Sequence, residues 1–223
     1  MDIKPVTWSH SGLKKFEQCA RQYHEVQVLK KYPFKDTPQT LYGKDLHKAI
    51  EDYGRSKVPI PEKYAFVVPL VDTLLAKPGR KLFEHEMGIT PDLRPCDFKS
   101  DERWVRGIAD LLIVDDDNLT ARVVDWKTGS DKYPDRDQLV LMSLMVFAHF
   151  PHIRVVNSAL FFVVKGSMVK HRMEREDADS AWWQYRQRVA KLEAAHTHNV
   201  WNPSQSPLCG WCPVKTCAFH PDS

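Results

Sequence analysis

The apolar positions of the chain change their spacing several times, and each change predicts a different kind of element. In the first third they recur every three or four residues, as on one face of a helix. From Lys81 they alternate with polar positions, as on a strand that is buried on one face. Helical spacing returns after Pro134 and again after about Asp177. The predicted helices cover 9–25, 41–54, 61–77, 134–150 and a segment from 177, and the predicted strands cover 81–89, 102–114, 120–127, 154–164 and 168–174.

This order of elements predicts an α/β fold with a mixed β-sheet flanked by helices. Helices come first, followed by three strands, a single crossover helix, two further strands and a last helix. No internal repeat, low-complexity tract or Gly/Ser-rich linker marks a boundary. We therefore expect a single domain over 1–223.

Composition narrows the class of protein without defining its function. With 43% hydrophobic and 27% charged residues over 223 positions, the chain is typical of a globular protein rather than a disordered or fibrous one. Its start lacks the profile of a signal peptide, which favours a cytoplasmic protein. The longest apolar run, 139–150, suits a buried helix better than a membrane span. A net charge of +3 cannot by itself establish a nucleic-acid partner.

Two charged residues lie on one face of a predicted buried strand, in the sequence VVDWKTG (123–129). Side chains alternate along a strand, so Asp125 and Lys127 project to the same side. If the preceding turn is centred on Asp117 and Asn118, Asp110 lies directly opposite Asp125 in the hairpin. Opposed residues have Cα atoms about 4.5 to 5.5 Å apart, and two like charges at that distance destabilise a sheet unless a positive group lies between them.

A divalent cation would relieve this repulsion, and carboxylate oxygens suit Mg²⁺ or Mn²⁺. The ammonium of Lys127 would lie nearby, where it can orient or deprotonate a metal-bound water and balance the charge of a phosphate. The arrangement fits phosphodiester hydrolysis by metal-activated water. The alternative is that Asp125 and Lys127 form a solvated charge pair on an edge strand, because D-x-K alone is a weak signal.

Three segments of the chain resemble one nuclease family. GIAD (107–110) and VVDWKTG (123–129), separated by one hairpin, are similar to motifs of the PD-(D/E)XK nuclease superfamily, specifically of its RecB-like branch. Upstream, GKDLHKAIE (43–51) resembles the branch's motif of a glycine and a metal-binding histidine, here Gly43 and His47. The CRISPR-associated adaptation nucleases and the phage RecB-like exonucleases belong to this branch.

The resemblance implies a restriction-endonuclease-like core and a role for each matched residue. It implies Asp110, Asp125 and His47 as metal ligands, the main-chain carbonyl of Trp126 as a further ligand, and Lys127 as the catalytic lysine. The branch also has Gln-x3-Tyr on the crossover helix; here Gln138 is followed at that spacing by Met142, so only the glutamine is expected at the site. Taken alone, His47 would more often be an ordinary core or surface histidine. We expect Glu51, Glu84 and Glu86 to be solvated, structural or supporting residues rather than ligands.

Four of the five cysteines are placed as metal ligands. Cys209-x2-Cys212-x4-Cys217 is typical of thiolates that converge on one soft ion or cluster. With His220 as the fourth ligand the tail would be a zinc knuckle, whereas with Cys19 the two chain ends, 1–30 and 200–223, would share a site. The resemblance favours Cys19 and a [4Fe-4S] cluster, since the branch has one cysteine near the N-terminus and three near the C-terminus; zinc is the alternative. Cys96 follows Pro95 in a predicted loop and is expected to take no part.

The function expected from these features is a metal-dependent DNA nuclease, an exonuclease of recombination, repair or replication, encoded by a phage or mobile element and then acting in the host cytoplasm. The alternatives are an inactive DNA-binding or scaffold module of the same fold and an RNA-processing nuclease. Nothing in the sequence specifies the oligomeric state or a base sequence. The candidate phosphate contacts are Lys14, Lys15, Arg21, Lys30, Lys31, Lys165, Lys170 and Arg172, and the aromatic residues considered for base stacking are Trp8, Tyr23 and Tyr42.

Overall fold

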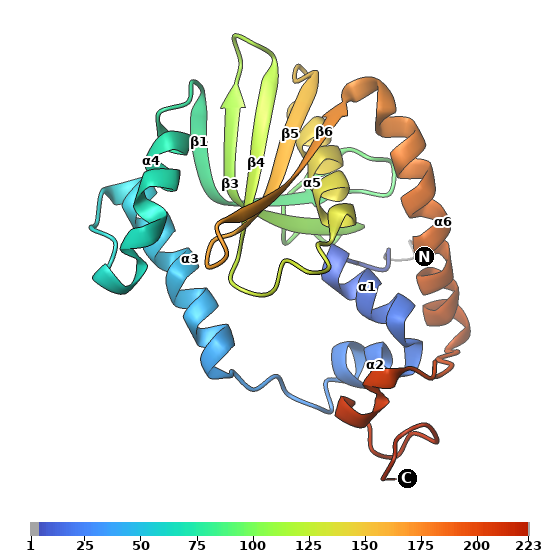
Figure 1. Cartoon of the computed structure of the whole chain (residues 1–223). Coiled ribbons are helices and arrows are strands. Elements are labelled where there is room, and N and C mark those ends of the chain that lie inside the picture. Colours follow the sequence, from blue (N-terminus) through green and yellow to red (C-terminus); the bar gives the residue numbers. More distant parts are fainter. Residues whose placement is uncertain (1–4, 223) are drawn as a thin grey trace. The chain divides into compact units, whose positions relative to one another are not determined.

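The alternating segments form one six-stranded sheet in the computed structural model of the protein (Figure 1). The strands lie in the order β2-β1-β3-β4-β5-β6. Neighbouring strands are antiparallel except for β4 and β5, which run parallel because helix α5 carries the chain back between them. The strand bounds are β1 Arg80–Ile89, β2 Pro95–Cys96, β3 Val105–Asp115, β4 Thr120–Lys127, β5 Val155–Phe162 and β6 Ser167–Glu174. The sheet is therefore mixed, as the sequence predicts.

The structure describes residues 5–222, so the first four residues, which entered the signal-peptide prediction, lie outside it. The described chain forms two compact units. We call Pro5 together with Asp36–Ala181 the sheet unit, because it holds all six strands. We call Val6–Lys35 together with the chain from Trp182 the terminal unit.

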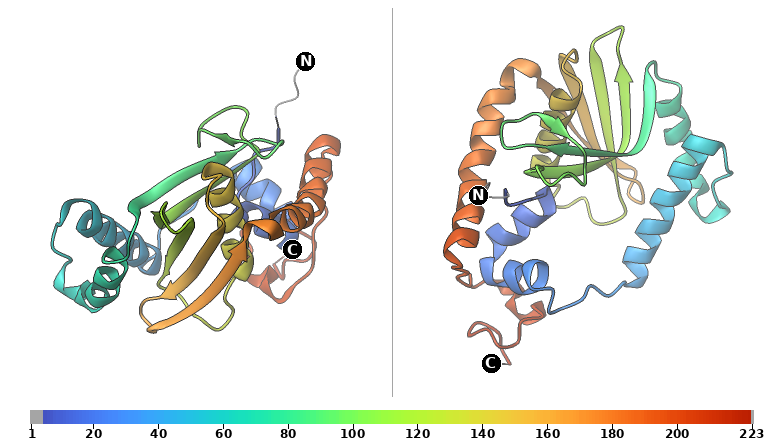
Figure 2. Two further views of the ribbon diagram at one scale, coloured as in Figure 1. Left: turned by 90° about the horizontal axis from the view of Figure 1, so that it is seen from above. Right: turned by 180° about the vertical axis from the view of Figure 1, so that it is seen from behind.

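Helices cover both faces of the sheet. The bounds are α3 Pro38–Ser56, η2 Glu62–Val67, α4 Val68–Leu75 and α5 Arg136–His149. Buried side chains of α3, η2 and α4 pack with Leu111, Val124 and Trp126 on one face. On the other face Leu139 of α5 packs with Leu160 and Phe162. Figure 2 shows α3 and α4 side by side next to β1.

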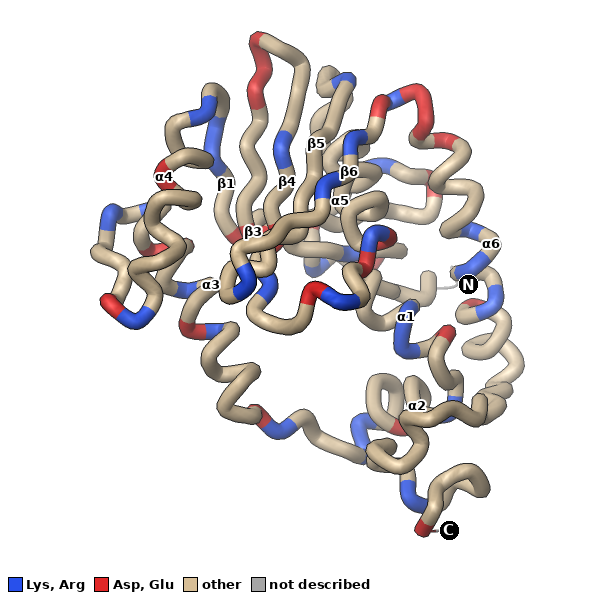
Figure 3. Tube along the Cα trace, in the orientation of Figure 1, with Lys and Arg blue, Asp and Glu red and all other residues tan. Residues whose placement is uncertain are grey.

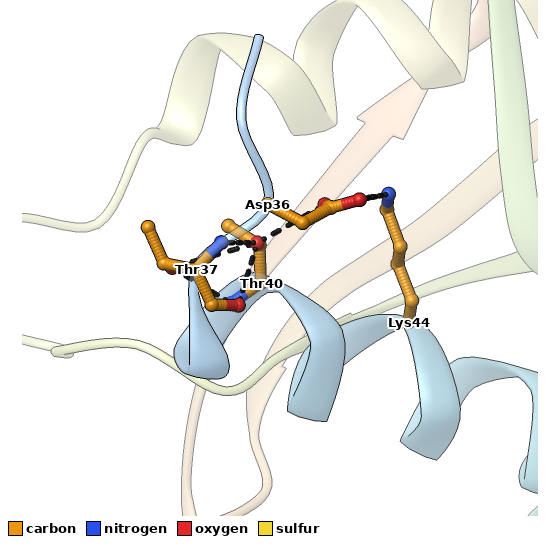
Figure 4. A network of polar contacts seen from close by, with 4 residues as sticks. All are labelled: Asp36, Thr37, Thr40 and Lys44. Atoms are coloured by element: carbon orange, nitrogen blue, oxygen red, sulfur yellow. Dashed lines mark hydrogen bonds and ion pairs between the residues drawn. The ribbon is translucent and has the colours of Figure 1, made fainter.

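Helix α3 begins with a set of polar contacts that fixes its first turn (Figure 4). The Thr37 hydroxyl accepts a hydrogen bond from the Thr40 amide at 3.2 Å, and the Thr40 hydroxyl accepts one from the Thr37 amide at 2.8 Å. Asp36 accepts from Thr40 and forms an ion pair of 2.7 Å with Lys44. Pro38 at the first helical position adds to this start signal. The helix then places Leu46 and Ile50 in the core, and neither is accessible to solvent.

Three predicted elements differ in detail. The first predicted helix is divided into α1 His10–Gln18, α2 Ala20–Tyr23 and the π-helix η1 His24–Val28, because Cys19 has an extended backbone. The third is divided into η2 and α4 close to Pro69, which lies in the first turn of α4. Pro95 and Cys96 were predicted as a loop, and they instead form the short strand β2 on Ile89 and Gly88 of β1.

The terminal unit is built around helix α6, Ala178–His198, which follows the short turn η3 Arg175–Asp177. In this unit Trp8 stacks on Tyr185 with ring centroids 5.7 Å apart, and Arg188 forms an ion pair of 2.6 Å with Glu17 of α1. The chain ends after the turn η4 Pro207–Trp211. Within the described part of the chain, no helix combines the length and the apolar character that crossing a membrane requires.

Candidate metal and catalytic site

The candidate site lies where β3 and β4 separate. Their antiparallel ladder runs from Asp115 paired with Thr120 to Leu111 paired with Val124. This is the register predicted from the sequence, although four residues rather than two join the strands. One step beyond Leu111 and Val124, the register places Asp110 opposite Asp125. The two acids therefore stand at the point where the ladder ends.

At the next position, a hydrogen bond to the side chain of Asp110 takes the place of the main-chain hydrogen bonds between the two strands. Its Oδ2 atom accepts a hydrogen bond of 2.7 Å from the main-chain N–H of Trp126. The carboxyl is largely buried, with 12% of the side chain exposed. It is therefore fixed between the two strands and directed toward β4.

His47 reaches the same place from α3. Its Nε2 atom is 2.9 Å from the carbonyl oxygen of Trp126, and its Nδ1 atom is 3.4 Å from Oδ2 of Asp110. The neighbouring Leu46 is buried against the sheet, which fixes the rotation of the helix and so the direction of His47. The histidine therefore contacts two other predicted ligands, the Trp126 carbonyl and Asp110, one through each ring nitrogen.

Glu84 joins this group, although the sequence suggested only a structural or supporting role for it. Ligand atoms of His47, Glu84 and Asp110 all lie within 4.8 Å of one another. In the β1–β3 ladder Phe83 pairs with Leu111 and His85 with Ala109, so Glu84 lies level with Asp110. Its φ of 44° is in the left-handed region, which is unusual for a glutamate within a strand. Strand pairing carried one step further in the sequence would have placed Glu84 in the row with Asp110 and Asp125.

Asp125 lies beside this group and is held by two other predicted residues. Its Oδ2 atom forms an ion pair of 2.7 Å with Nζ of Lys127, and its Oδ1 atom accepts a hydrogen bond from the amide of Gln138 on α5. The side chain of Asp125 is 8% exposed, whereas that of Lys127 is 33% exposed. The ammonium is therefore accessible from solvent while the carboxylate that holds it is buried.

The electrostatics of the site favour a bound cation. Burial raises the pKa of Asp110 well above its ordinary value, and the charge of Asp125 raises it further. The pKa of Glu84 is also raised, first by burial and then by the charge of Glu51. Burial lowers the pKa of His47. A divalent cation among these groups would stabilise the ionised carboxylates and would bind the neutral imidazole.

The donor set suits a hard divalent ion. His47 Nε2 and the Trp126 carbonyl oxygen lie 2.9 Å apart, at hydrogen-bond distance, so the imidazole and the carbonyl face each other at the site. Carboxylate and carbonyl oxygens with one imidazole suit Mg²⁺ and Mn²⁺.

The four predicted cysteine ligands line one small pocket of the terminal unit, together with Val214 and His220. Main-chain amides point at two of the sulfurs: those of Gln22 and Ser204 at Cys19, each at 3.5 Å, and that of Ser206 at Cys209, at 3.4 Å. In the described chain, however, no three of these cysteines have all their sulfur atoms within 4.8 Å of one another. The structure thus brings Cys19, Cys209, Cys212 and Cys217 to one pocket and does not show a metal site there.

The candidate DNA contacts are divided between the units. Lys14, Lys15, Arg21, Lys30 and Lys31 belong to the terminal unit, and Lys165, Lys170 and Arg172 to the sheet unit. Lys31 is paired with Glu25 at 2.8 Å. Among the aromatic candidates, Trp8 and Tyr23 are buried, and Tyr42 packs edge-on against Tyr64. These three rings pack within their own units, which leaves little of them for base stacking.

A mixed sheet covered by helices, with carboxylates and a lysine where two of its strands separate, is consistent with a restriction-endonuclease-like core. The sequence model of the PD-(D/E)XK nuclease superfamily matches residues 62–217, and the chain belongs to this superfamily. The match includes Asp110, Asp125 and Lys127 and begins after His47.

One solved structure with a TM-score above 0.5 supports this fold, and a second is similar at a lower score. A protein from Eubacterium rectale named a "putative exonuclease" is similar with a TM-score of 0.52 and 13% identity, over 92% of this chain and 86% of that one. The protein SSO0001 aligns with a TM-score of 0.46 and 14% identity, over 98% of this chain and 87% of that one. A search of curated proteins found no match.

Proposed function

We propose that the protein is a divalent-metal-dependent DNA nuclease that hydrolyses phosphodiester bonds. The observation that carries this proposal is the group of His47, Glu84 and Asp110 next to the pair of Asp125 and Lys127. Asp110, Asp125 and Lys127 project from the separating strands β3 and β4. Glu84 projects from β1 and His47 from α3, so main-chain geometry holds the five together. The nuclease superfamily of the chain supports the same reaction.

We assign the metal site to His47, Asp110, Asp125 and the Trp126 carbonyl, and we add Glu84 from its position. When bound, Mg²⁺ or Mn²⁺ would supply charge to a phosphate oxygen and acidity to a water. Lys127 is the residue that would orient this water and balance the charge of the phosphate, since its ammonium is partly exposed and held at Asp125. Gln138 keeps Asp125 in place through its amide.

DNA as the substrate and an exonuclease mode are the finer parts of this proposal. They rest on the RecB-like motifs and on the name of the similar Eubacterium rectale protein. The same motifs support a role in recombination, repair or replication and an origin in a phage or mobile element. An RNA-processing enzyme with the same centre and an inactive scaffold module are the competing functions. The intact set of Asp110, Asp125, Lys127 and His47 argues against the scaffold.

We also propose that Cys19, Cys209, Cys212 and Cys217 hold a [4Fe-4S] cluster that joins the two chain ends within the terminal unit. The shared pocket and the amides directed at Cys19 and Cys209 support this assignment. The placement of one cysteine near the N-terminus and three near the C-terminus, as in the RecB-like branch, favours the cluster over zinc.

Incubation with labelled single- and double-stranded DNA and RNA tests the reaction. We expect DNA to be cut with Mg²⁺ or Mn²⁺, no cutting with EDTA, and a loss of at least about 100-fold for Lys127→Ala, since a positioned acid-base group contributes this much. Lys99→Ala, an exposed lysine of the same unit, is the matched control. A Lys127→Ala variant as active as the parent would overturn the mechanism. Cutting of RNA alone would show that RNA, not DNA, is the substrate.

Iron and sulfide analysis of anaerobically purified protein tests the cluster. We expect a brown protein with iron and sulfide, and loss of both in Cys19→Ala. Cys96→Ala is the control, because Cys96 lies on β2 of the sheet unit. A colourless protein that contains zinc, and that keeps this zinc in Cys19→Ala, would indicate a zinc knuckle instead of the cluster.

A further inference from the structure

A groove of about 610 Å³ opens on the sheet unit over β4, β5 and β6. It lies on the sheet face of Val124 and Trp126, opposite to the face of Asp125 and Lys127, because successive side chains of β4 alternate. Neither the proposed metal site nor the cysteine pocket uses it. Figure 3 marks basic positions on β4 and β6, the strands that border this groove.

The strand register arranges the groove in rows across the three strands. Arg122 of β4 pairs with Asn157 of β5, which pairs with Arg172 of β6. In the next row Ala159 pairs with Lys170. In a third row Phe161 of β5 pairs with Met168 of β6. Paired residues project to one side, so polar and basic groups occupy one end of the groove floor and apolar groups the other.

The charge of the groove is of one sign. Lys77, Arg122, Lys170 and Arg172 line it, and none of its described lining residues is acidic. Arg172 is already paired with Glu174 of the same strand. Lys170 is exposed and Arg122 half-buried. The groove therefore presents the cations of Lys77, Arg122 and Lys170 to a ligand of opposite charge.

Arg122 gives the strongest indication of a ligand. Its Nη1 atom is buried and has no hydrogen-bond partner among the described residues. A buried donor of a charged group left without an acceptor is unfavourable by roughly 1–3 kcal/mol or more. Rotation of the half-buried side chain into the groove would let a phosphate or carboxylate oxygen satisfy it, and a guanidinium binds such oxygens with paired hydrogen bonds.

We propose that this groove binds single-stranded nucleic acid, with phosphates at Arg122 and Lys170 and bases against Met168. Met168 is 46% exposed, so it offers apolar surface to a base. A duplex keeps the faces of its bases stacked inside, whereas a single strand presents both charge and base faces. The inference deepens the proposed nuclease function and rests on it: the groove holds the strand on the sheet face away from the cutting site.

Fluorescence anisotropy with labelled oligo-dT in EDTA tests the groove without cutting. We expect Arg122→Gln/Lys170→Gln to bind at least about 10-fold more weakly at low salt. For this double variant, the slope of log affinity against log salt concentration should be smaller in magnitude by about 1.4 than for the parent. Each phosphate contact of a single strand contributes about 0.7 to that slope, and two contacts are removed. Lys99→Gln is the matched surface control. Glu174→Gln should bind more tightly, because it releases Arg172.

The variant Lys170→Gln, which changes one exposed side chain and leaves the fold intact, should show about half of the change in salt dependence. Unchanged binding in the double variant and in Lys170→Gln would overturn the proposal. Equal competition by poly-glutamate of matched charge would make the groove a general polyanion site and would also overturn it. Cutting of labelled DNA with Mg²⁺ and binding of oligo-dT in EDTA are separate readouts, so a failed nuclease function and a failed groove give different results.

Discussion

At the scale of single residues, the site depends on carboxylates in an unfavourable environment. Asp110, Asp125 and Lys127 could be predicted because the hairpin register follows from the turn and from strand alternation. Glu84 was assigned a lesser role because the strand pairing was not carried on from β3 to β1. Its left-handed φ of 44° is a feature that no sequence pattern indicates. Such a conformation costs a non-glycine residue about 1–3 kcal/mol and is concentrated at functional sites.

The metal-free protein should become less stable as the pH rises, through Asp110. The folded-state pKa of Asp110 is raised above its unfolded value, so its favourable contribution is complete below about pH 4 and is lost as the pH rises through the folded pKa. Asp110→Asn keeps the acceptor for the Trp126 amide and removes the charge. In EDTA at pH 8 we expect it to raise the free energy of unfolding by on the order of 1 kcal/mol, because the neutral amide is buried without the cost of desolvating a charge.

Urea denaturation at pH 4 and pH 8 measures this difference, which should disappear at pH 4. With Mn²⁺ the order should reverse, because the ion stabilises the parent more than the variant. A variant less stable than the parent in EDTA at pH 8 would contradict the account of Asp110.

At the scale of elements, the pattern of apolar residues predicted the strands and the crossover helix correctly, because each buries a continuous apolar face. It did not predict the break of the first helix at Cys19, where the backbone turns extended and the sulfur accepts the Gln22 amide. It also missed β2, which is too short to show alternation. The predicted His47 was placed by its motif, and its contact with Trp126 depends on how α3 packs on the sheet.

The packing of α3 on β1 can be tested at Gly54. A Cβ atom there would lie 2.0 Å from the ring of Phe83, the neighbour of Glu84. Gly54→Ala should therefore destabilise the protein by about 1–3 kcal/mol through overpacking, although alanine is otherwise the better helix former. It should also weaken metal binding by moving Glu84.

Thermal unfolding and Mn²⁺ titration of Gly54→Ala measure both effects. Gly129→Ala is the control for stability, since no atom lies within 4 Å of the added Cβ. A Gly54→Ala variant as stable as the parent would contradict the tight packing of α3 on β1.

At the scale of the whole molecule, residues near both chain ends meet in the terminal unit, while the proposed reaction belongs to the sheet unit. The sequence predicted the four cysteines as one set through their spacing and the family resemblance. It did not predict two compact units, because the chain enters and leaves the terminal unit without a linker of distinctive composition. The geometry of the sulfurs depends on packing that the spacing does not encode.

Loss of the cysteine site should loosen the terminal unit selectively. Limited proteolysis of Cys19→Ala should cut within 6–35 or after residue 182 at least about 10-fold faster than the parent, because a bound cluster favours the folded unit. Mass spectrometry of the fragments locates the cuts, and Cys96→Ala should behave as the parent does. Equal resistance of Cys19→Ala and the parent would show that the cysteines do not stabilise this unit.

The central claim is that a divalent ion binds where β3 and β4 separate. Anomalous diffraction from crystals soaked in Mn²⁺ tests it most directly. The account predicts a peak within bonding distance of His47 and Asp110 and of the Trp126 carbonyl, and the absence of this peak in Asp110→Asn. A protein that cuts DNA with Mn²⁺ but shows no ion at these residues, or binds its ion elsewhere, would contradict the account.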